Sequence, residues 1–257
     1  MTHTATHQSA HETSLWPLLT GLGVLLSALA LLAYFEWRLP VLGIVLGGGV
    51  LAVLAVGLAG WAREFFTSGT EEGLGSVAVA AFIVSEVVIF GTVFVAFWLG
   101  RIDNVDQWAS FIPGELSRVF AVWLTVILWA SSGTIVLSQR AAENDNRRAA
   151  LFWLAATFAL GLLFVVLHIN EWRHLAAAGF RVGSNIYATT FYGLTGVHTS
   201  HVLVGLLSHI LLFGVLASGL MKKNRVTLFR GTSLYWHFVD VMWLMVAANA
   251  YFIGGTS

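Results

Sequence analysis

SVAVAAFIVSEVVIFGTVFVAFWL, residues 76–99, contains a single ionisable side chain, that of Glu86. A helix of this length spans about 36 Å at 1.5 Å per residue, more than the ~30 Å hydrocarbon layer of a bilayer. Backbone groups in hydrocarbon must be paired, and the apolar residues here are continuous instead of alternating. The segment therefore predicts a transmembrane helix, and with it an integral membrane protein.

Six further apolar segments of similar length flank this one. They lie at residues 15–35, 39–61, 116–137, 149–169, 190–220 and 232–253. Hydrophobic residues make up 58% of the chain and charged residues 10%, whereas a soluble domain carries roughly 25% charged residues. The sequence therefore predicts an all-α membrane protein, a bundle of about seven transmembrane helices that follows a polar tail at residues 1–14.

The charged residues limit the partners and predict the orientation. Thirteen basic and thirteen acidic residues cancel, so nothing indicates a nucleic-acid partner, and the absence of cysteine excludes thiolate metal sites. Basic residues are more numerous in the loops on the N-terminal side, namely Arg63, Arg140, Arg147, Arg148, Lys222, Lys223, Arg225 and Arg230. The other side holds Arg38, Arg101, Arg118, Arg173 and Arg181. The positive-inside rule then predicts a cytoplasmic N-terminus and an external C-terminus.

Small and aromatic residues predict helix contacts and membrane boundaries. Gly43 and Gly47 form a G-x-x-x-G spacing, from which we expect close packing against a neighbouring helix. Tryptophans near the predicted helix ends are typical of an interfacial aromatic belt. These are Trp98, Trp108, Trp172 and Trp236.

Glu86 lies about ten residues into its predicted helix, close to the bilayer centre. A charged carboxylate there costs a few kcal/mol or more, so we expect this group to be protonated or paired. A proton-handling or lipid-contact site and a structural hydrogen bond between helices are both consistent with this position.

Histidines inside the predicted helices form a second set of candidates. His198 and His201 are three residues apart on one face of segment 190–220, with His209 two turns further on. Buried histidines can bind haem or copper, but no second helix carries a facing pair, and an interhelical hydrogen-bonding stripe is the favoured interpretation. The pairs His168–Glu171 and His237–Asp240 have the same spacing and favour helix contacts over proton relay.

Taken together, these segments resemble subunit III of the haem-copper respiratory oxidases. Four pieces carry the match in the first part of the chain: HETSLWPL at residues 11–18, WARE at 61–64, SEVVIF at 85–90 and SSGT at 131–134. Three more follow: LHINEW at 167–172, TGVHTSHVLVG at 195–205 and YWHFVDVMW at 235–243. The last two are the most specific, because generic hydrophobicity explains neither.

The resemblance implies a domain organisation and a set of partners. Residues 15–61 would form a two-helix hairpin and residues 62–257 a five-helix bundle, with a phospholipid-binding cleft between them. The chain would pack directly against subunit I, in a complex with subunit II and small subunits that receives electrons from cytochrome c. Haem and copper would be held by those partners. This chain would stabilise subunit I, bind phospholipid and support proton uptake in a proton-pumping aa3-type cytochrome c oxidase.

The resemblance also implies roles for individual residues. Glu86 would lie beside the cleft and face subunit I, with Trp61, Arg63 and Glu64 near lipid headgroups. An internal polar network would consist of His168, Glu171, His198, His201, His237 and Asp240. No residue would be catalytic or bind a metal, so the chain would be a non-catalytic subunit of an enzyme. It would lie in the bacterial inner membrane, with its C-terminus in the periplasm.

Three other functions stay open on the sequence. A quinol oxidase subunit III is one, although such versions typically lack the first two helices that are predicted here. A stand-alone membrane haem protein using the histidines of segment 190–220 is another. A free-standing transporter is the third, since polar groups occur in several of the predicted helices.

Overall fold

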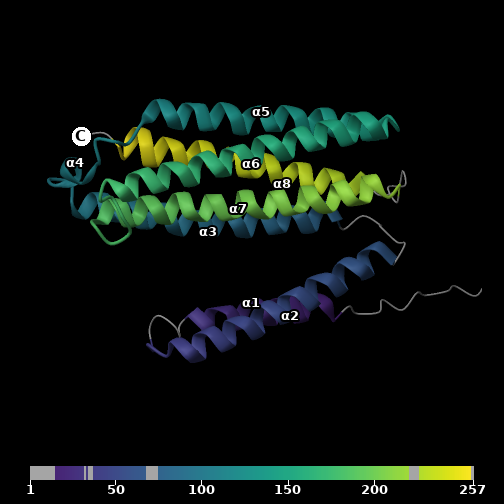
Figure 1. Cartoon of the computed structure of the whole chain (residues 1–257), viewed down its shortest axis with the longest axis horizontal. Coiled ribbons are helices and arrows are strands. Elements are labelled where there is room, and N and C mark those ends of the chain that lie inside the picture. Colours follow the sequence, from purple (N-terminus) through teal and green to yellow (C-terminus); the bar gives the residue numbers. More distant parts are fainter. Residues whose placement is uncertain (1–14, 32, 34–36, 68–74, 220–225, 256–257) are drawn as a thin grey trace, which may run out of the picture. The chain divides into compact units, whose positions relative to one another are not determined.

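The computed structural model describes residues 15–31, 33, 37–67, 75–219 and 226–255, drawn as coloured ribbon in Figure 1. For some helical residues, among them 61–67 and 75–81, the backbone alone is described. The chain divides into two compact units, Met1–Thr70 and Glu71–Ser257.

The first unit is an antiparallel hairpin of α1 (Trp16–Leu31) and α2 (Pro40–Thr67). Two glycines bring the backbones together: a Cβ on Gly23 would lie 2.7 Å from the Leu54 side chain, and one on Gly60 would overlap the Trp16 ring. Of the two glycines at the predicted G-x-x-x-G spacing, Gly43 is buried, and Gly47 has no described atom within 4 Å of its Cβ position. The close packing at this spacing therefore stays a prediction.

The second unit is built around a closed ring of four long helices. They are α5 (Arg118–Glu143), α6 (Arg147–Ala177), α7 (Ile186–Ala217) and α8 (Val226–Ala247). Each packs against the next, and α8 returns to α5, while α3 (Gly75–Asp103) packs against α7 and α8 (Figure 1). The short α4 (Trp108–Phe111) lies in the connection after α3, and a π-helical turn, η3 (Ala248–Ile253), continues α8. The regular elements of the described residues are therefore all helical, as predicted.

Six helices of the described residues are long and apolar enough to cross a membrane. These spans are Pro40–Gly57, Phe82–Asp103, Arg118–Glu143, Arg147–Ala177, Ile186–Ala217 and Leu228–Ile253. Each corresponds to one of the predicted segments. The first predicted segment, 15–35, contains α1, which has 16 described residues and falls short of a spanning length. The count of seven spans therefore stays a prediction.

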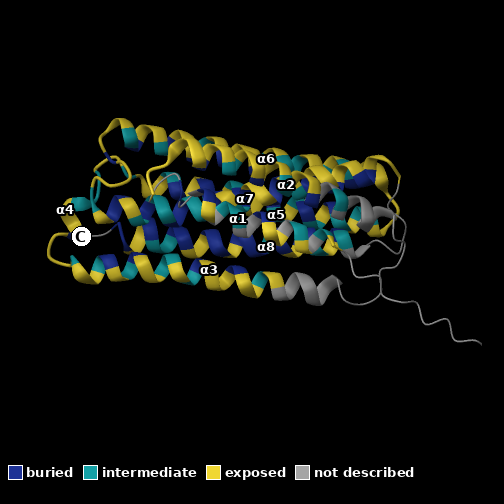
Figure 2. Ribbon diagram, turned by 90° about the horizontal axis from the view of Figure 1, so that it is seen from below, coloured by how far each residue is buried: buried dark blue, intermediate teal, exposed yellow. Residues whose placement is uncertain are grey.

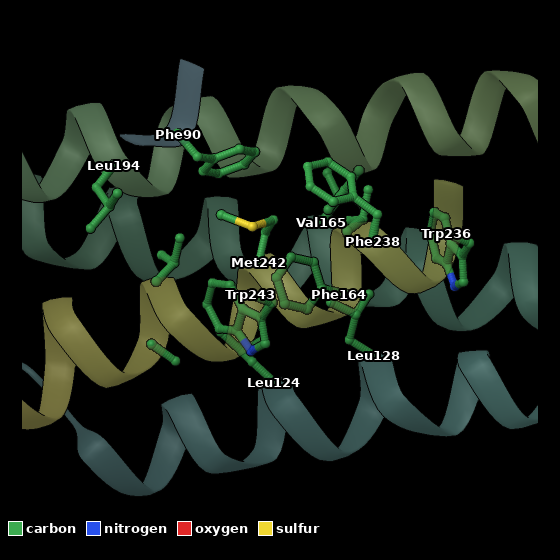
Figure 3. Packing of buried hydrophobic residues seen from close by; sticks show 14 of the residues in the cluster. Phe90, Leu124, Leu128, Phe164, Val165, Leu194, Trp236, Phe238, Met242 and Trp243 are labelled. Carbon is green, nitrogen blue, oxygen red and sulfur yellow. The ribbon is translucent and has the colours of Figure 1, made fainter. Parts of the chain in front are cut away.

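The core of the second unit lies inside the helix ring. Trp236 and Trp243 of α8 are fully buried and pack with Phe164 of α6 and with Leu124 and Leu128 of α5 (Figure 3). Outward faces carry large exposed apolar side chains, and Figure 2 shows buried residues following the inner faces of the helices. An apolar exterior of this kind is stable against lipid, where water would penalise it.

Trp236 is the tryptophan whose predicted place was wrong. We expected it in an interfacial belt, because the predicted segment began at residue 232. In the structure α8 begins at Val226, so Trp236 lies ten residues into the helix and its indole donates to Ser131 Oγ at 2.8 Å. A polar partner inside the bundle allows the indole nitrogen to be buried.

The C-terminal end of η3 is capped by donors from other helices. Its last carbonyl groups have no partner within the helix. Trp108 Nε1 donates to the Gly254 carbonyl at 2.7 Å, Arg118 Nη2 to Gly255 at 2.6 Å, and Arg101 to Ile253. Two cationic donors at a helix C-terminus also complement its dipole. This cluster ties the end of the chain to α3 and α5.

Candidate functional site

The central polar contact of the second unit joins α3 to α7. Glu86 Oε2 of α3 lies 2.7 Å from His201 Nε2 of α7, and each side chain is only 12% exposed. Both residues lie in the middle of long apolar helices. Opposed polar groups at this depth pair with each other because hydrocarbon offers neither of them another partner.

A second bond of His201 fixes the arrangement of protons. His201 Nδ1 lies 2.7 Å from the carbonyl oxygen of Val197, one turn earlier in α7. A carbonyl oxygen can only accept, so Nδ1 carries a hydrogen and donates it. Nε2 therefore shares one proton with Glu86, either as an acceptor from a carboxylic acid or as a donor to a carboxylate. In both states the pair has no net charge, and the proton can move between them without leaving an isolated charge in hydrocarbon.

Aromatic side chains surround the pair. The ring of Phe90 lies 4.8 Å from the His201 ring, and the Tyr235 hydroxyl of α8 donates to the His201 carbonyl at 3.1 Å. On the opposite face of α3 the apolar side chains of Val84 and Val88 are exposed. Glu86 therefore points into the seam between α3, α7 and α8, and its helix turns an apolar face outwards.

A second polar cluster lies between α5 and α8. Ser132 Oγ lies 2.8 Å from His237 Nδ1 and donates to Asp240 Oδ2, while His237 Nδ1 and Asp240 Oδ2 are 4.0 Å apart. Asp240 is buried, and its Oδ1 has no hydrogen-bond partner among the described residues. The Ser132 hydroxyl therefore links a buried carboxyl group to a half-exposed imidazole across two helices.

A third cluster lies near the other end of the helices. Glu171 Oε2 of α6 accepts a hydrogen bond from the Tyr251 hydroxyl of η3 at 2.7 Å and lies 3.3 Å from His168 Nδ1. All three residues are buried. The His168 contact is close enough for an ion pair but lacks hydrogen-bond geometry, so Tyr251 is the directional partner of the carboxylate.

The other two histidines of α7 are packed against aromatic rings. The His198 ring lies 5.0 Å from Trp243 and 5.7 Å from Phe164, and the His209 ring lies 4.4 Å from Trp236. Their ring nitrogens have no hydrogen-bond partner among the described residues. Within those residues no group of three or more histidines, cysteines or acidic residues is placed to hold a metal ion.

The structure connects residues that sequence reasoning had left separate. It pairs Glu86 with His201, whereas the sequence grouped His201 with His198, and it adds Tyr235, Ser132 and Tyr251. Their polar groups inside apolar helices were the available signal, but spacing within one helix cannot identify a partner on another. The side chains of Trp61, Arg63 and Glu64 lie outside those that the structure describes.

Comparisons with known proteins identify relatives along nearly the whole chain. The family model described as cytochrome c oxidase subunit III matches residues 8–255. Cytochrome c oxidase subunit 3 of Mycosarcoma maydis is 30% identical over 256 residues, covering 93% of this chain and 92% of that protein. The Corynebacterium diphtheriae protein of the same name is 31% identical, over 69% of this chain and 87% of the relative. A probable quinol oxidase subunit 3 of Staphylococcus aureus is 33% identical, over 73% and 93%.

Proposed function

The chain belongs to the cytochrome c oxidase subunit III family, and from this premise we propose that it is the non-redox subunit III of a proton-pumping aa3-type cytochrome c oxidase. In aerobic electron transport it stabilises subunit I, with subunit II in the same complex, binds phospholipid and supports proton uptake. The haem and copper that reduce dioxygen are held by the partner subunits. The complex lies in a bacterial inner membrane, with the N-terminus of this chain cytoplasmic and its C-terminus periplasmic.

The Glu86–His201 pair is the observation that carries this proposal. It is a neutral pair that holds one shared proton in the middle of the bundle, 2.7 Å between Nε2 and Oε2. Within such a pair a proton can move from the carboxyl group to the imidazole and give an ion pair with no net charge, which suits support of proton uptake.

The outer face of α3 supports contact with a large apolar partner. Val84, Val88 and Val95 are exposed on that face, and Val87 is exposed at its edge. Branched apolar side chains pack as well against another transmembrane helix as against lipid. We assign this face to subunit I because it lies on the helix that positions Glu86.

The electron donor is proposed from the extent of the alignments. The presence of two N-terminal spans does not distinguish cytochrome c from quinol as the donor. A cytochrome c oxidase relative aligns with only 69% of this chain and a quinol oxidase relative with only 73%. Relatives that align with 93% of the chain are cytochrome c oxidase subunits. We therefore propose cytochrome c over quinol as the donor to the complex.

The geometry of α7 disfavours a stand-alone haem protein. Both ring nitrogens of His201 are engaged, one by Glu86 and one by the Val197 carbonyl. His198 and His209 are each in close contact with a tryptophan ring. The ring nitrogens of His198 and His209 have no partner among the described residues, but an axial haem ligand also needs room for the porphyrin, and aromatic rings pack against both histidines.

Purification through an affinity tag on this chain tests the proposal. We expect native mass spectrometry to show a complex with a much larger subunit, and the absorption spectrum to show haem in that complex. After this chain is dissociated by detergent, the haem should stay with the remaining subunits, and the complex should oxidise reduced cytochrome c but not quinol. A Soret band in the isolated chain, or purification without partners, would contradict the proposal.

A further inference from the structure

A groove lies between α6 and α7, away from the three polar clusters. Its volume is about 300 Å³, and it is lined by Leu154, Ala155, Phe158, His209, Ile210 and Phe213. Leu154 and His209 are buried and form the floor, while Ile210 and Phe213 are exposed at the wall. Because the lining is almost wholly apolar and the outer surface of both helices faces hydrocarbon, the groove matches an acyl chain in shape and polarity.

Two small residues of α7 lie between the groove and one end of the helices. Gly214 and Ala217 follow Ile210 on the same face of α7, at steps of four and three residues. No described atom lies within 4 Å of the position that a Cβ on Gly214 would occupy. This path along α7 therefore carries no large side chain at these two positions.

Arginines lie where that path reaches the end of the helices. Arg148 precedes Ala155, and Arg147 precedes Leu154, each by seven residues, so each pair shares a face of α6 about 10 Å apart. Arg147 reaches the turn that follows α7, since its Nη1 lies 3.5 Å from the Cβ position of Gly219. Two acidic residues, Glu143 and Asp145, lie at the connection between α5 and α6, and Glu143 is paired with Arg230 at 3.5 Å. Both arginines of α6 are exposed at this end of the helices.

We propose that this groove binds one anionic phospholipid, with an acyl chain along α6 and α7 and its phosphate at Arg147 and Arg148. Charge complementarity selects an anionic headgroup, because two guanidinium groups sit above a groove that contains no acidic side chain. The first N–H groups of α6 add to the positive potential at the same point. The site lies wholly on α6 and α7 of the second unit. It rests on the phospholipid binding proposed above and gives that binding a location and a headgroup charge.

The test compares lipid retention in the purified complex that contains this chain. Phosphatidylglycerol and phosphatidylcholine with matched chains are added at equal concentration, and bound lipid is counted by native mass spectrometry. One basic residue near an anionic lipid changes affinity about fivefold, so the double variant Arg147→Gln with Arg148→Gln should retain one phosphatidylglycerol about thirtyfold more weakly. Ala155→Trp, which fills the groove, should displace the same lipid. Phosphatidylcholine retention should not change in either variant.

Two matched control variants on α5 test whether the lipid binds at α6 and α7. Arg140→Gln removes an exposed arginine of α5 at the same end, and Ala130→Trp enlarges an exposed alanine of α5. Both should retain phosphatidylglycerol like the unmodified chain. Unchanged phosphatidylglycerol in either the arginine variant or the groove variant would overturn the proposal. Equal loss of phosphatidylglycerol in the α5 controls would also overturn it. The same holds if the Ala155→Trp complex loses a protein subunit in place of the lipid. Where the double variant does not assemble, Arg148→Gln alone serves, with a fivefold effect expected.

Discussion

At the scale of single residues, the structure shows that the carboxyl group of Glu86 is paired with the imidazole of His201. Glu86 was recognisable from the sequence because it is the one ionisable residue in residues 76–99. His201 was not recognisable as its partner, since the two are 115 positions apart and the face of α7 that meets α3 is fixed only by packing. We expected Glu86 to be protonated or paired, and the structure identifies His201 as its partner, with one proton shared between the two side chains.

The first prediction concerns the stability of that pair. Glu86→Leu leaves His201 Nε2 buried without a partner and should destabilise the chain by about 1–3 kcal/mol. Glu86→Gln keeps a donor for the neutral imidazole and should cost less than about 1 kcal/mol. Thermal unfolding of the purified complex measures both, with Ser85→Ala on the exposed side of α3 as the control. Equal losses for leucine and glutamine would mean that the hydrogen bond does not stabilise the fold.

The second prediction concerns the hydroxyl between α5 and α8. Ser132→Ala removes the contacts of Ser132 Oγ with both His237 and Asp240. Asp240 then keeps neither oxygen bonded, so we expect a loss of about 1–2 kcal/mol in the free energy of unfolding. Ser200→Ala, whose hydroxyl bonds the Val197 carbonyl of its own helix, is the matched control and should change little. If the two variants unfold alike, the α5–α8 link contributes nothing measurable.

At the scale of elements, hydropathy predicted the helices well and their ends poorly. The predicted segment 149–169 corresponds to α6, which continues to Ala177 and carries Glu171 on its extra turns. Charged residues end an apolar segment in the sequence, but the helix itself continues past them, because Glu171 is buried and accepts a hydrogen bond from Tyr251. For the same reason the last helix was predicted to begin at residue 232, which placed Trp236 near a helix end, whereas α8 begins at Val226.

The third prediction tests the cap on η3. Arg118→Ala removes the donor to the Gly255 carbonyl, and Arg101→Ala removes that to Ile253. Each should loosen the last turns by about 1–2 kcal/mol while the ring of long helices stays intact. Hydrogen exchange of the amides at residues 248–255 should become faster, whereas exchange in α6 should not. Unchanged exchange at the C-terminal turns would show that the arginines do not hold them.

The fourth prediction tests the hairpin of the first unit. A Cβ at Gly60 would overlap the Trp16 ring, so Gly60→Leu should separate α1 from α2. Gly47→Leu lies on the same helix with open space around it, so it should leave the hairpin unchanged. A cysteine pair placed at residues 23 and 54 reports the separation through its rate of disulfide formation. The contact between α1 and α2 would have to be reassigned if Gly47→Leu slowed that rate as much as Gly60→Leu.

At the scale of the whole molecule, the second unit buries its paired polar groups together with an apolar core and exposes large apolar side chains. Specific motifs such as TGVHTSHVLVG and YWHFVDVMW predicted the family from the sequence, and the match of residues 8–255 agrees with them. What the sequence did not yield is the pairing between helices, because each motif reports one helix alone. A chain with paired carboxyl groups and a lipid-compatible exterior is suited to support the chemistry of a partner within the membrane.

The number of turnovers that the purified oxidase completes before inactivation measures most directly how this chain supports its partner. The complex with Glu86→Gln is compared with the unmodified complex and with Ser85→Ala, and oxygen consumption is followed until activity is lost. Because glutamine keeps the contact to His201 but cannot share a proton, we predict normal assembly and a normal initial rate. We also predict several-fold fewer turnovers before inactivation than in either comparison complex. Equal numbers of turnovers in all three complexes would contradict a functional role for the Glu86–His201 pair.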